Sequence, residues 1–326
     1  MAVVDSPATF GYFRIFKDRP RRPNAPQGVR LLRALTMGTL SDLVQFIFAG
    51  LTGGAIYALV ALGFGVVHNT MGIVNFTQVD FVSLGGMLLF SALFAAGLPM
   101  AAALAVAVAG VALIAWWVEV LGLQPSRSQS HLVLIFLTIG LSITLRGVMK
   151  LIWGKNRMAV PSLSGEEPVR WLGATILPQT LWILALTAVA IVCLVLFFRK
   201  TSLGLAMRGV AANAQAAAVV GLKVGQLKAL SFALAGALGG LAGCLVTPIT
   251  TLSYDVGVLL GLKGFAAAIL GGFGSFPGAI AGGLLLGLLE SLGAAYISSA
   301  YKDVIAFVVL LLVLFIRPRG LLGGET

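Results

Sequence analysis

Long stretches of apolar residues alternate with short polar or glycine-rich segments along almost the whole chain. The stretches cover residues 43–67, 79–98, 100–123, 132–153, 181–198, 227–246, 256–272, 278–295 and 304–316. Because roughly 20 apolar residues in a helix cross a hydrocarbon core about 30 Å thick, most stretches are long enough to span a membrane. Unbroken runs indicate helices rather than the alternating segments of a membrane β-barrel. The pattern predicts an all-α polytopic membrane protein with about eight or nine transmembrane helices, some broken by glycine.

Composition supports a membrane environment and leaves little mass outside it. Of the 326 residues, 59% are hydrophobic and 10% are charged, and the mean hydropathy is +1.03. An ordinary soluble domain carries about a quarter charged residues. The two cysteines, Cys193 and Cys244, lie inside apolar stretches and predict no disulfide framework. We therefore expect a multi-pass protein of the bacterial inner (plasma) membrane.

The net charge of +11 comes from basic residues that flank the apolar stretches. This distribution is typical of orientation by cytoplasmic Lys and Arg and of attraction to anionic membrane lipid, so nucleic acid is not expected as a partner. The strongest topological marker is the segment 199–228, which contains no acidic residue. Its basic residues are Arg199, Lys200, Arg208, Lys223 and Lys228. We place this segment in the cytoplasm and the segment 154–177 on the opposite side.

A basic, proline-containing tail is predicted over residues 1–41, ahead of a membrane domain over residues 42–326. Its charge indicates a flexible segment on the cytoplasmic face, either simply solvated or used to dock a partner. No short apolar stretch with a small-residue cleavage site follows, so we do not expect a secretory signal. Nine simple spans, however, would place this basic tail outside the cell when segment 199–228 is inside.

One broken or re-entrant helix would resolve this conflict, and glycine-rich sequence predicts its place. Between residues 43 and 79 the chain contains Gly53, Gly54, Gly63, Gly65 and Gly72. A comparable cluster covers 257–278, where Pro277 stops one helix before the next. Irregular backbone at membrane depth lines polar cavities, and transporters built from repeats carry such breaks in both halves. The alternative is close helix packing at small residues, which we favour for any single glycine.

The cytoplasmic segment contains the alanine-rich sequence TSLGLAMRGVAANAQAAAVVGLKV, residues 201–224. It predicts a short amphipathic helix whose small residues form a surface that enters a groove on a partner, as in the coupling helix of bacterial ABC importers, which it resembles. A helix lying on lipid is the alternative, but such helices carry a more strongly apolar face. The candidate ATPase-coupling residues are Gly204, Arg208, Ala211, Asn213, Ala217 and Gly221.

The resemblance becomes specific when two further segments are added. They are LTGGAIYALVALGFGVVHNTMGIVNFTQVDFVSLGGML, residues 51–88, and the region 261–323, which begins GLKGFAAAILGGFGSFPG. Together with 201–224 they resemble the LivH-type permease of branched-chain amino-acid ABC importers, over residues 46–323. The resemblance implies a permease domain and three kinds of partner: a LivM-type second permease, two cytoplasmic ATPase subunits and a solute-binding protein outside. Where the family has a glycine after Gln78, this chain has Val79, which predicts a less free backbone.

Polar residues at membrane depth mark either a pathway or a structural pair. The candidates for a translocation pathway are Asn75, Phe76, Gln78, Asp80 and Glu290. Glu290 has two interpretations: contact with the ammonium of a passing amino acid, or a structural bond to a neighbouring helix, Arg146 or Lys150. We favour the structural one.

Other ionisable residues have simpler interpretations. Lys302 and Asp303 are expected to pair with each other at the interface, and Glu119 to reach the interface from a helix end. His68 and His131 lack a suitably spaced second ligand, so no metal is expected.

Three classes of function compete. A passive permease of an ATP-driven importer needs the coupling segment, whereas a stand-alone secondary transporter or channel does not. An enzyme is not expected, because the chain contains no GxxxxGK[ST], HExxH or GxSxG motif, and no cofactor is implied. Within the importer class the sequence leaves branched-chain amino acids, other amino acids, urea and small amides open.

Overall fold

The computed structural model describes residues 27–126, 130–165, 167–171, 174–317 and 320–322. The chain divides into two units, residues 1–42 and residues 43–326. The basic tail predicted over residues 1–41 lies outside the described residues as far as position 26. From Gln27 its backbone is helical.

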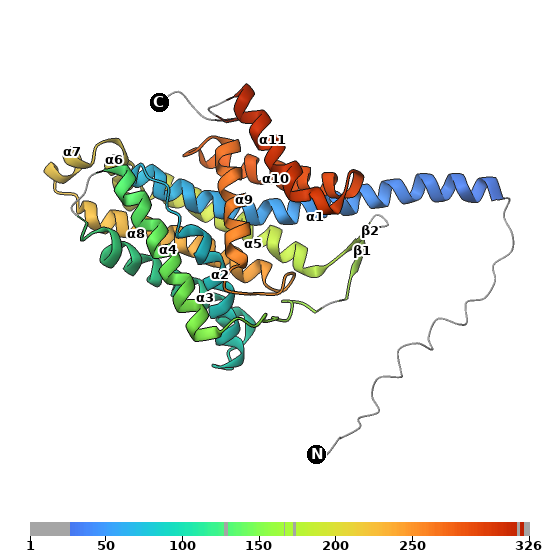
Figure 1. Ribbon diagram of the computed structural model, residues 1–326, viewed down its shortest axis with the longest axis horizontal. Coiled ribbons are helices and arrows are strands. Elements are labelled where there is room, and N and C mark those ends of the chain that lie inside the picture. Colours follow the sequence, from blue (N-terminus) through green and yellow to red (C-terminus); the bar gives the residue numbers. More distant parts are fainter. Residues whose placement is uncertain (1–26, 127–129, 166, 172–173, 318–319, 323–326) are drawn as a thin grey trace, which may run out of the picture. The chain divides into compact units, whose positions relative to one another are not determined.

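Helices dominate the described residues (Figure 1). The α-helices are α1 (Gln27–Met71), α2 (Gln78–Phe94), α3 (Met100–Trp117), α4 (His131–Trp153), α5 (Pro178–Lys200), α6 (Ser202–Ala212), α7 (Ala214–Val219), α8 (Val224–Val246), α9 (Val256–Gly271), α10 (Phe276–Tyr296) and α11 (Lys302–Ile316). A π-helical turn, Val118–Leu123, extends α3, and a 3-10 turn, Ser299–Tyr301, precedes α11. The strands β1 (Val169–Trp171) and β2 (Ala174–Ile176) form one antiparallel hairpin in which Val169 pairs with Ile176.

Six helices of the described part of the chain are long and apolar enough to cross a membrane. They are Ser41–Met71, Met100–Leu123, His131–Trp153, Pro178–Lys200, Val224–Val246 and Phe276–Tyr296. Helices α2 and α9 are apolar but shorter. The prediction of an all-α polytopic membrane protein is confirmed.

The break expected between residues 43 and 79 lies at Gly72, and the expectation is corrected for the four glycines before it. Helix α1 continues without interruption through Gly53, Gly54, Gly63 and Gly65, and the backbone leaves the helix only at Gly72, where φ is 72°. Gly54, Gly63 and Gly65 face residues of other helices, and none of the four glycines interrupts the hydrogen-bonded backbone. A glycine within a helix costs only about 1 kcal/mol relative to alanine, which close packing offsets.

The late glycine cluster does contain the predicted break. Helix α9 ends at Gly271, and φ reaches 102° at Gly272 and 92° at Gly274, values that favour glycine. Ser275 then caps α10, because its Oγ accepts a hydrogen bond from the Gly278 amide at 3.2 Å. Pro277 occupies the first turn, where its missing N–H costs nothing.

Glycines on both helices let α1 and α10 approach closely. A β-carbon at Gly54 would lie 2.8 Å from the Leu284 Cα, and one at Gly287 would lie 2.3 Å from the Gly54 amide nitrogen. Four-residue spacing places Gly50 and Gly54 on one face of α1, opposite Gly283 and Gly287 on α10. This is the small-xxx-small arrangement of membrane helix pairs.

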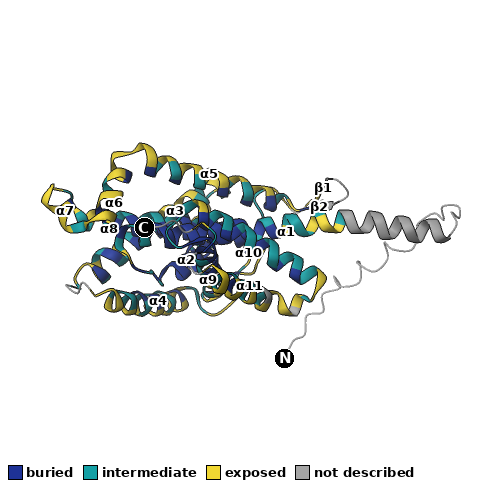
Figure 2. Cartoon of the chain, turned by 90° about the horizontal axis from the view of Figure 1, so that it is seen from above, coloured by how far each residue is buried: buried dark blue, intermediate teal, exposed yellow. Residues whose placement is uncertain are grey.

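Helix α8 packs against both α2 and α3 in the interior. Gly85 of α2 lies against Gly240 of α8, and Gly243 lies against the Val82 carbonyl. Figure 2 shows buried residues gathered in this region, whereas α4 and α5 carry exposed residues along their outer edges. Those exposed residues are largely apolar, as at Phe136 and Val192, which is what a lipid-facing helix requires.

Helices α6 and α7 lie at one end of the 43–326 unit, and the β1–β2 hairpin lies at the other (Figure 1). Helix α1 runs between these ends. Ser291 Oγ donates to the Phe46 carbonyl near the hairpin end, and Asn69 Nδ2 donates to the Gly274 carbonyl near the α6 end, each at 2.7 Å. Leu43 and the 199–228 segment therefore lie at opposite ends of this unit. Helix α1 does not turn back between them, so the expected re-entrant helix does not explain how the basic tail and the basic segment 199–228 could lie on the same side.

We expect Gly287→Val to lower the stability of the detergent-purified protein by about 1–3 kcal/mol, the usual range for overpacking, because the new side chain would push α10 away from Gly54. Thermal unfolding measures the effect. Gly140→Val is the matched control, since a β-carbon at Gly140 meets nothing within 4 Å and the helix-propensity cost is the same. Equal losses from both substitutions would show that the α1–α10 contact is not needed.

Candidate functional site

The connection between α1 and α2 brings four of the predicted pathway residues together. Asn75 is fully buried, and its Oδ1 accepts hydrogen bonds from the backbone amide of Thr77, at 3.1 Å, and from the Thr77 hydroxyl. This local turn closes the non-helical segment between α1 and α2 and leads into the first turn of α2. The Phe76 amide donates to Thr138 Oγ1 of α4 at 3.2 Å, and its ring lies 6.0 Å from that of Phe265 on α9.

Gln78 lies where α1, α2 and α8 meet. Its Nε2 donates to the Ala235 carbonyl at 3.0 Å, and a β-carbon at Gly63 would lie only 2.0 Å from that nitrogen. Within the described residues, Gln78 Oε1 and Asn75 Nδ2 are buried and have no hydrogen-bond partner. Unpaired buried polar atoms are costly, so they mark a place suited to a polar solute or water.

Asp80 is 1% exposed and is held by an ion pair rather than by solvent. Its Oδ1 lies 2.9 Å from Arg146 Nε of α4, and its Oδ2 accepts from the Ser142 hydroxyl. Arg146 Nη2 also donates to Ser142 Oγ at 2.8 Å. The paired charges make an aspartate tolerable among apolar helices, and they tie the lipid-facing α4 to α2.

Val79, the predicted departure from the family pattern, fits against glycine on the facing helix. A β-carbon at Gly261 of α9 would lie 2.3 Å from Val79 Cγ1, and one at Gly257 would lie 2.3 Å from the Val79 carbonyl oxygen. The additional bulk on α2 is therefore accommodated by the absence of side chains on α9.

Glu290 belongs to a second cluster, apart from Asn75 and Asp80. Its Oε2 accepts from the Tyr57 hydroxyl and its Oε1 lies 2.7 Å from Lys263 Nζ, both contacts being 2.7 Å long. Tyr57 and Gly63, which contacts Gln78, are separated by about 9 Å of rise along α1 at roughly 1.5 Å per residue. The five predicted pathway residues thus form two groups.

Several predicted partners are wrong. Arg146 pairs with Asp80 and not with Glu290, while Lys150 lies over the Tyr254 ring at 5.7 Å. Asp303 pairs with Lys263 at 2.6 Å and not with Lys302. Glu119 was expected to reach the interface, yet it is 1% exposed, and the π-helical turn that contains it packs against α8.

Lys263 is the residue that sequence reasoning missed. It is 3% exposed and connects Glu290 to Asp303, so it organises the second cluster. The signal was present, because a lysine inside the apolar stretch 256–272 is an intramembrane charge, which by default has a structural or functional role.

The predicted coupling helix is divided into two short helices. Thr201 caps α6 by accepting from the Gly204 amide at 3.0 Å, and Asn213 caps α7 by accepting from the Ala216 amide at 2.9 Å. Asn213 has an extended backbone, with φ −159° and ψ 103°, so it separates α6 from α7. Gly221 ends the segment at φ 90°.

The six predicted coupling residues do not share one surface. Arg208, Ala211, Asn213 and Gly221 are exposed. Ala217 is buried, and a β-carbon at Gly204 would lie 2.4 Å from the Phe197 carbonyl oxygen. Placing Ala217 on the outer face was therefore wrong, because the turn at Asn213 rotates it inward.

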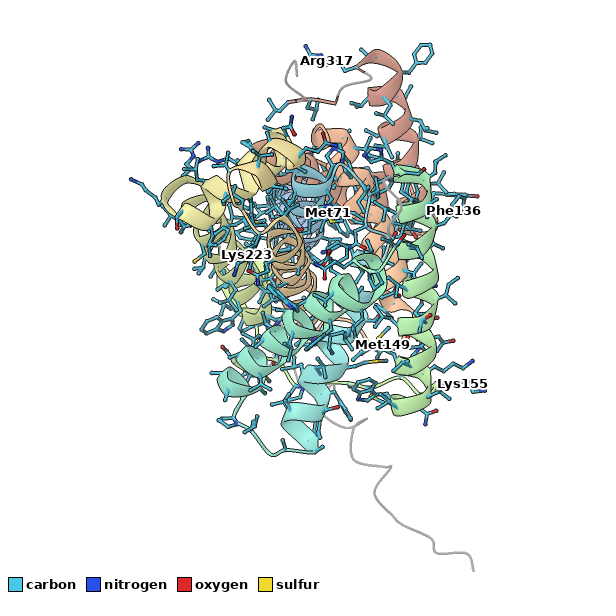
Figure 3. The ribbon with its side chains drawn as sticks, turned by 90° about the vertical axis from the view of Figure 1, so that its left-hand side faces the viewer. Met71, Phe136, Met149, Lys155, Lys223 and Arg317 are labelled. Atoms are coloured by element: carbon cyan, nitrogen blue, oxygen red, sulfur yellow. The ribbon has the colours of Figure 1, made fainter. Side chains whose placement is uncertain are left out.

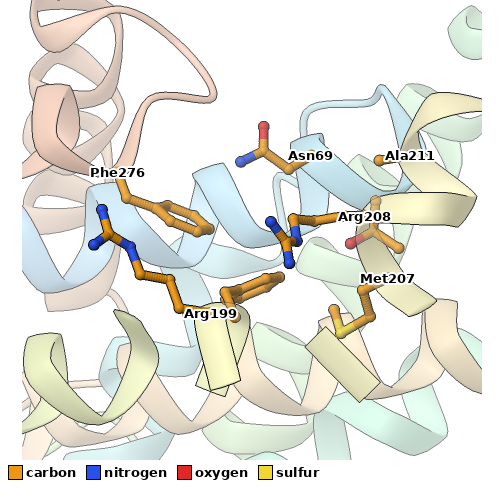
Figure 4. A pocket seen from close by; sticks show the side chains of 8 residues that line it. Asn69, Arg199, Met207, Arg208, Ala211 and Phe276 are labelled. Carbon is orange, nitrogen blue, oxygen red and sulfur yellow. The ribbon is translucent and has the colours of Figure 1, made fainter. Parts of the chain in front are cut away.

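A cavity of about 330 Å³ lies beside α6. Figure 4 shows the side chains that line it, among them Arg199 of α5, Arg208 of α6, Asn69 of α1 and Phe276 of α10. Figure 3 views the molecule from this end and labels Lys223 and Met71 on it. Residues of α1, α5 and α10 therefore share this cavity with the inner side of α6.

Glycine-packed apolar helices and buried charge pairs between them are features of a multi-pass membrane transport protein. The model of the family described as "Branched-chain amino acid transport system / permease component" matches residues 46–314, and the chain belongs to this family.

Three relatives illustrate the similarity. The chain is 33% identical over 298 residues to the high-affinity branched-chain amino acid transport system permease protein LivH of Escherichia coli K12, covering 86% of this chain and 95% of that protein. It is 33% identical to BraD of Pseudomonas aeruginosa, covering 88% and 98%. It is 29% identical to the probable LivH of Methanocaldococcus jannaschii, covering 84% and 92%. These relatives are named as transport permeases, a role without catalysis.

We expect Asp80→Asn and Arg146→Gln each to destabilise the protein by about 3 kcal/mol, because each leaves a charge without its partner inside the membrane domain. The double variant should lose less than the sum of the two, with a coupling energy of about 1–3 kcal/mol. Chemical unfolding of all four proteins in detergent measures the cycle. Strict additivity would mean that the pair contributes nothing to stability.

Proposed function

We propose that this protein is one of two permease subunits of an ATP-driven importer for branched-chain amino acids in the bacterial inner membrane. The partners are a LivM-type second permease, two cytoplasmic ATPase subunits, a solute-binding protein on the outer side, and the surrounding lipid. Family membership supports the importer class, and the names of the relatives support the substrate.

The observation that carries the coupling proposal is the exposed surface of α6 and α7, which lie in the basic segment 199–228 that the sequence places in the cytoplasm. Exposed apolar residues accompany Arg208 on this surface, namely Leu203, Leu205, Val219 and Val220. A mixed apolar and cationic surface suits a groove on a partner protein better than it suits water. We assign this surface to the ATPase subunits.

Motion of α6 has a direct route into the membrane domain. Gly204 packs against the backbone of Phe197 and Phe198 at the end of α5, so α6 cannot shift without moving α5. The cavity lined by Arg199 and Arg208 reaches Asn69 and Phe276, at the ends of α1 and α10. ATP-dependent closure of the ATPases would thereby change the packing of three membrane helices, with the energy supplied from outside this chain.

The pathway candidates keep their proposed role in two groups. Asn75, Phe76, Gln78 and Asp80 surround the break before α2, where two buried polar atoms lack partners among the described residues. Glu290 lies nearer the opposite end of the bundle from α6. A solute entering from outside would meet the Glu290 group first and the α2 group afterwards.

Affinity purification of the tagged full-length chain from native membranes tests the proposal. We expect an ATPase and a second permease to co-purify in stoichiometric amounts. A homo-oligomer alone, in a detergent that preserves a known importer of this kind, would favour the stand-alone secondary transporter or channel. An intact complex in which leucine fails to compete for uptake would favour an importer of urea or small amides.

We expect Arg208→Glu to reduce transport at least tenfold while the protein still inserts, because a negative charge would face the ATPase surface. Substrate uptake and the amount of co-purified ATPase measure the effect. Arg157→Glu is the matched control, since Arg157 is exposed on the segment 154–177 at the other end of the unit. Normal uptake and normal ATPase recovery in the Arg208 variant would remove α6 from the coupling mechanism.

A further inference from the structure

A second cavity, of about 480 Å³, lies toward the end of the unit opposite α6 and α7. It is bounded by α1, the start of α5, the end of α8, α9 and α10. Its walls are mainly aliphatic: Ile56, Ile183, Val246, Leu259 and Leu260. Pockets of roughly 300–1,000 Å³ with few polar groups are typical of small-molecule sites.

The polar part of this cavity is a charged cluster that other parts of the protein hold in place. Lys263, Glu290 and Lys302 all line the cavity. Lys263 Nζ lies 2.7 Å from Glu290 Oε1 and 2.6 Å from Asp303 Oδ1, while Lys302 Nζ lies 3.9 Å from Glu290 Oε1. With two lysines and two acidic residues, the cluster has no formal net charge.

The geometry points to a binding site for an aliphatic α-amino acid in its zwitterionic form, an inference that rests on the proposed importer function. We propose that the ligand carboxylate pairs with Lys302 and Lys263, and that its ammonium pairs with Glu290. The aliphatic side chain then lies against the apolar walls. Both ligand charges meet opposite charges, and the overall neutral cluster takes up a ligand that is also neutral overall.

The two lysines differ in their freedom to bind. Lys263 is already held by two carboxylates at short distance. Lys302 is half exposed and lies at the limit of ion pairing with Glu290, so its ammonium has the capacity to accept a second partner. Tyr57 donates to Glu290 Oε2 at 2.7 Å and thus fixes the carboxylate beside the cavity. The ligand carboxylate should therefore depend most on Lys302.

Gly53 keeps one wall of this cavity open. A β-carbon at Gly53 would meet only the Tyr57 ring, at 3.9 Å, whereas its neighbour Gly54 faces the backbone of α10. A larger side chain at Gly53 would project into the cavity without disturbing a helix contact. This position consequently separates loss of binding from loss of folding.

The first test measures ligand binding to the full-length chain in lipid nanodiscs by ligand-observed NMR titration. The probes are L-leucine, 4-methylpentanoate, which lacks the ammonium, and 3-methylbutylamine, which lacks the carboxylate. We expect leucine to bind, and each analogue to bind at least tenfold more weakly because one charge of the cluster is left without its partner. Equal affinity for all three probes, or no binding of leucine, would overturn the proposal; the former would indicate a merely apolar cavity of the kind that lipid fills.

Two variants sharpen this test. Lys302→Met should weaken leucine binding at least tenfold and leave the affinity for 3-methylbutylamine unchanged, and Gly53→Leu should abolish binding of all probes. The matched controls are Lys155→Met, at an exposed lysine of the 154–177 segment, and Gly140→Leu, at a helical glycine with open space around it. Leucine binding at the level of the controls in both test variants would show that the ligand lies elsewhere.

Uptake by cells carrying the complete system distinguishes failure of this site from failure of the importer proposal. Leucine uptake that survives in both Lys302→Met and Gly53→Leu would refute the site while the importer function stands. Leucine binding with the expected selectivity, but without any co-purifying ATPase, would support the site and refute the importer function.

Discussion

Direct contact between helix backbones at glycine is the constraint on which the membrane domain depends. Lipid tails are as apolar as leucine, so helices gain little from hiding apolar side chains from lipid and associate mainly through close packing. Here α1 meets α10 at Gly54 and Gly287, α2 meets α8 at Gly85 and Gly240, and α9 meets α10 at Gly271 and Gly278. A β-carbon at Gly54, Gly85, Gly271, Gly278 or Gly287 would collide with the facing helix, and one at Gly240 would meet Val111 of α3, so these close contacts require glycine.

The close packing also determines where charge is tolerated. Asp80 and Arg146 come from α2 and α4, while Lys263 and Glu290 come from α9 and α10, so each pair links two helices. An unpaired charge in such surroundings would be costly, and each pair therefore stabilises its helix contact only while both members remain. The cluster around Glu290 has one half-exposed member, Lys302, and lines a cavity, which gives it a capacity for binding that the more enclosed Asp80 pair lacks.

The sequence predicted the helices well, because an unbroken apolar stretch of this length can satisfy its backbone hydrogen bonds in a membrane only as a helix. The break near Gly272 was also predictable, because clustered glycines precede Pro277. Between residues 43 and 79 only Gly72 ends a helix, whereas Gly53, Gly54, Gly63 and Gly65 lie within α1. A glycine that contacts another helix and a glycine that ends a helix look the same in a sequence, and only the position of Gln78 against Gly63 or of Leu284 against Gly54 tells them apart.

By itself, the sequence determined that the chain is an all-α polytopic membrane protein and that it resembles the family to which it belongs, because these properties depend on local composition and ordered motifs. The tertiary structure decided the partners of Glu290 and Asp80, the burial of Ala217 and the continuity of α1 as far as Met71. Tyr57 and Glu290 are 233 positions apart, yet their side chains share a hydrogen bond. Contacts over such separations depend on how the helices pack, and the pattern within a single helix does not specify its neighbours.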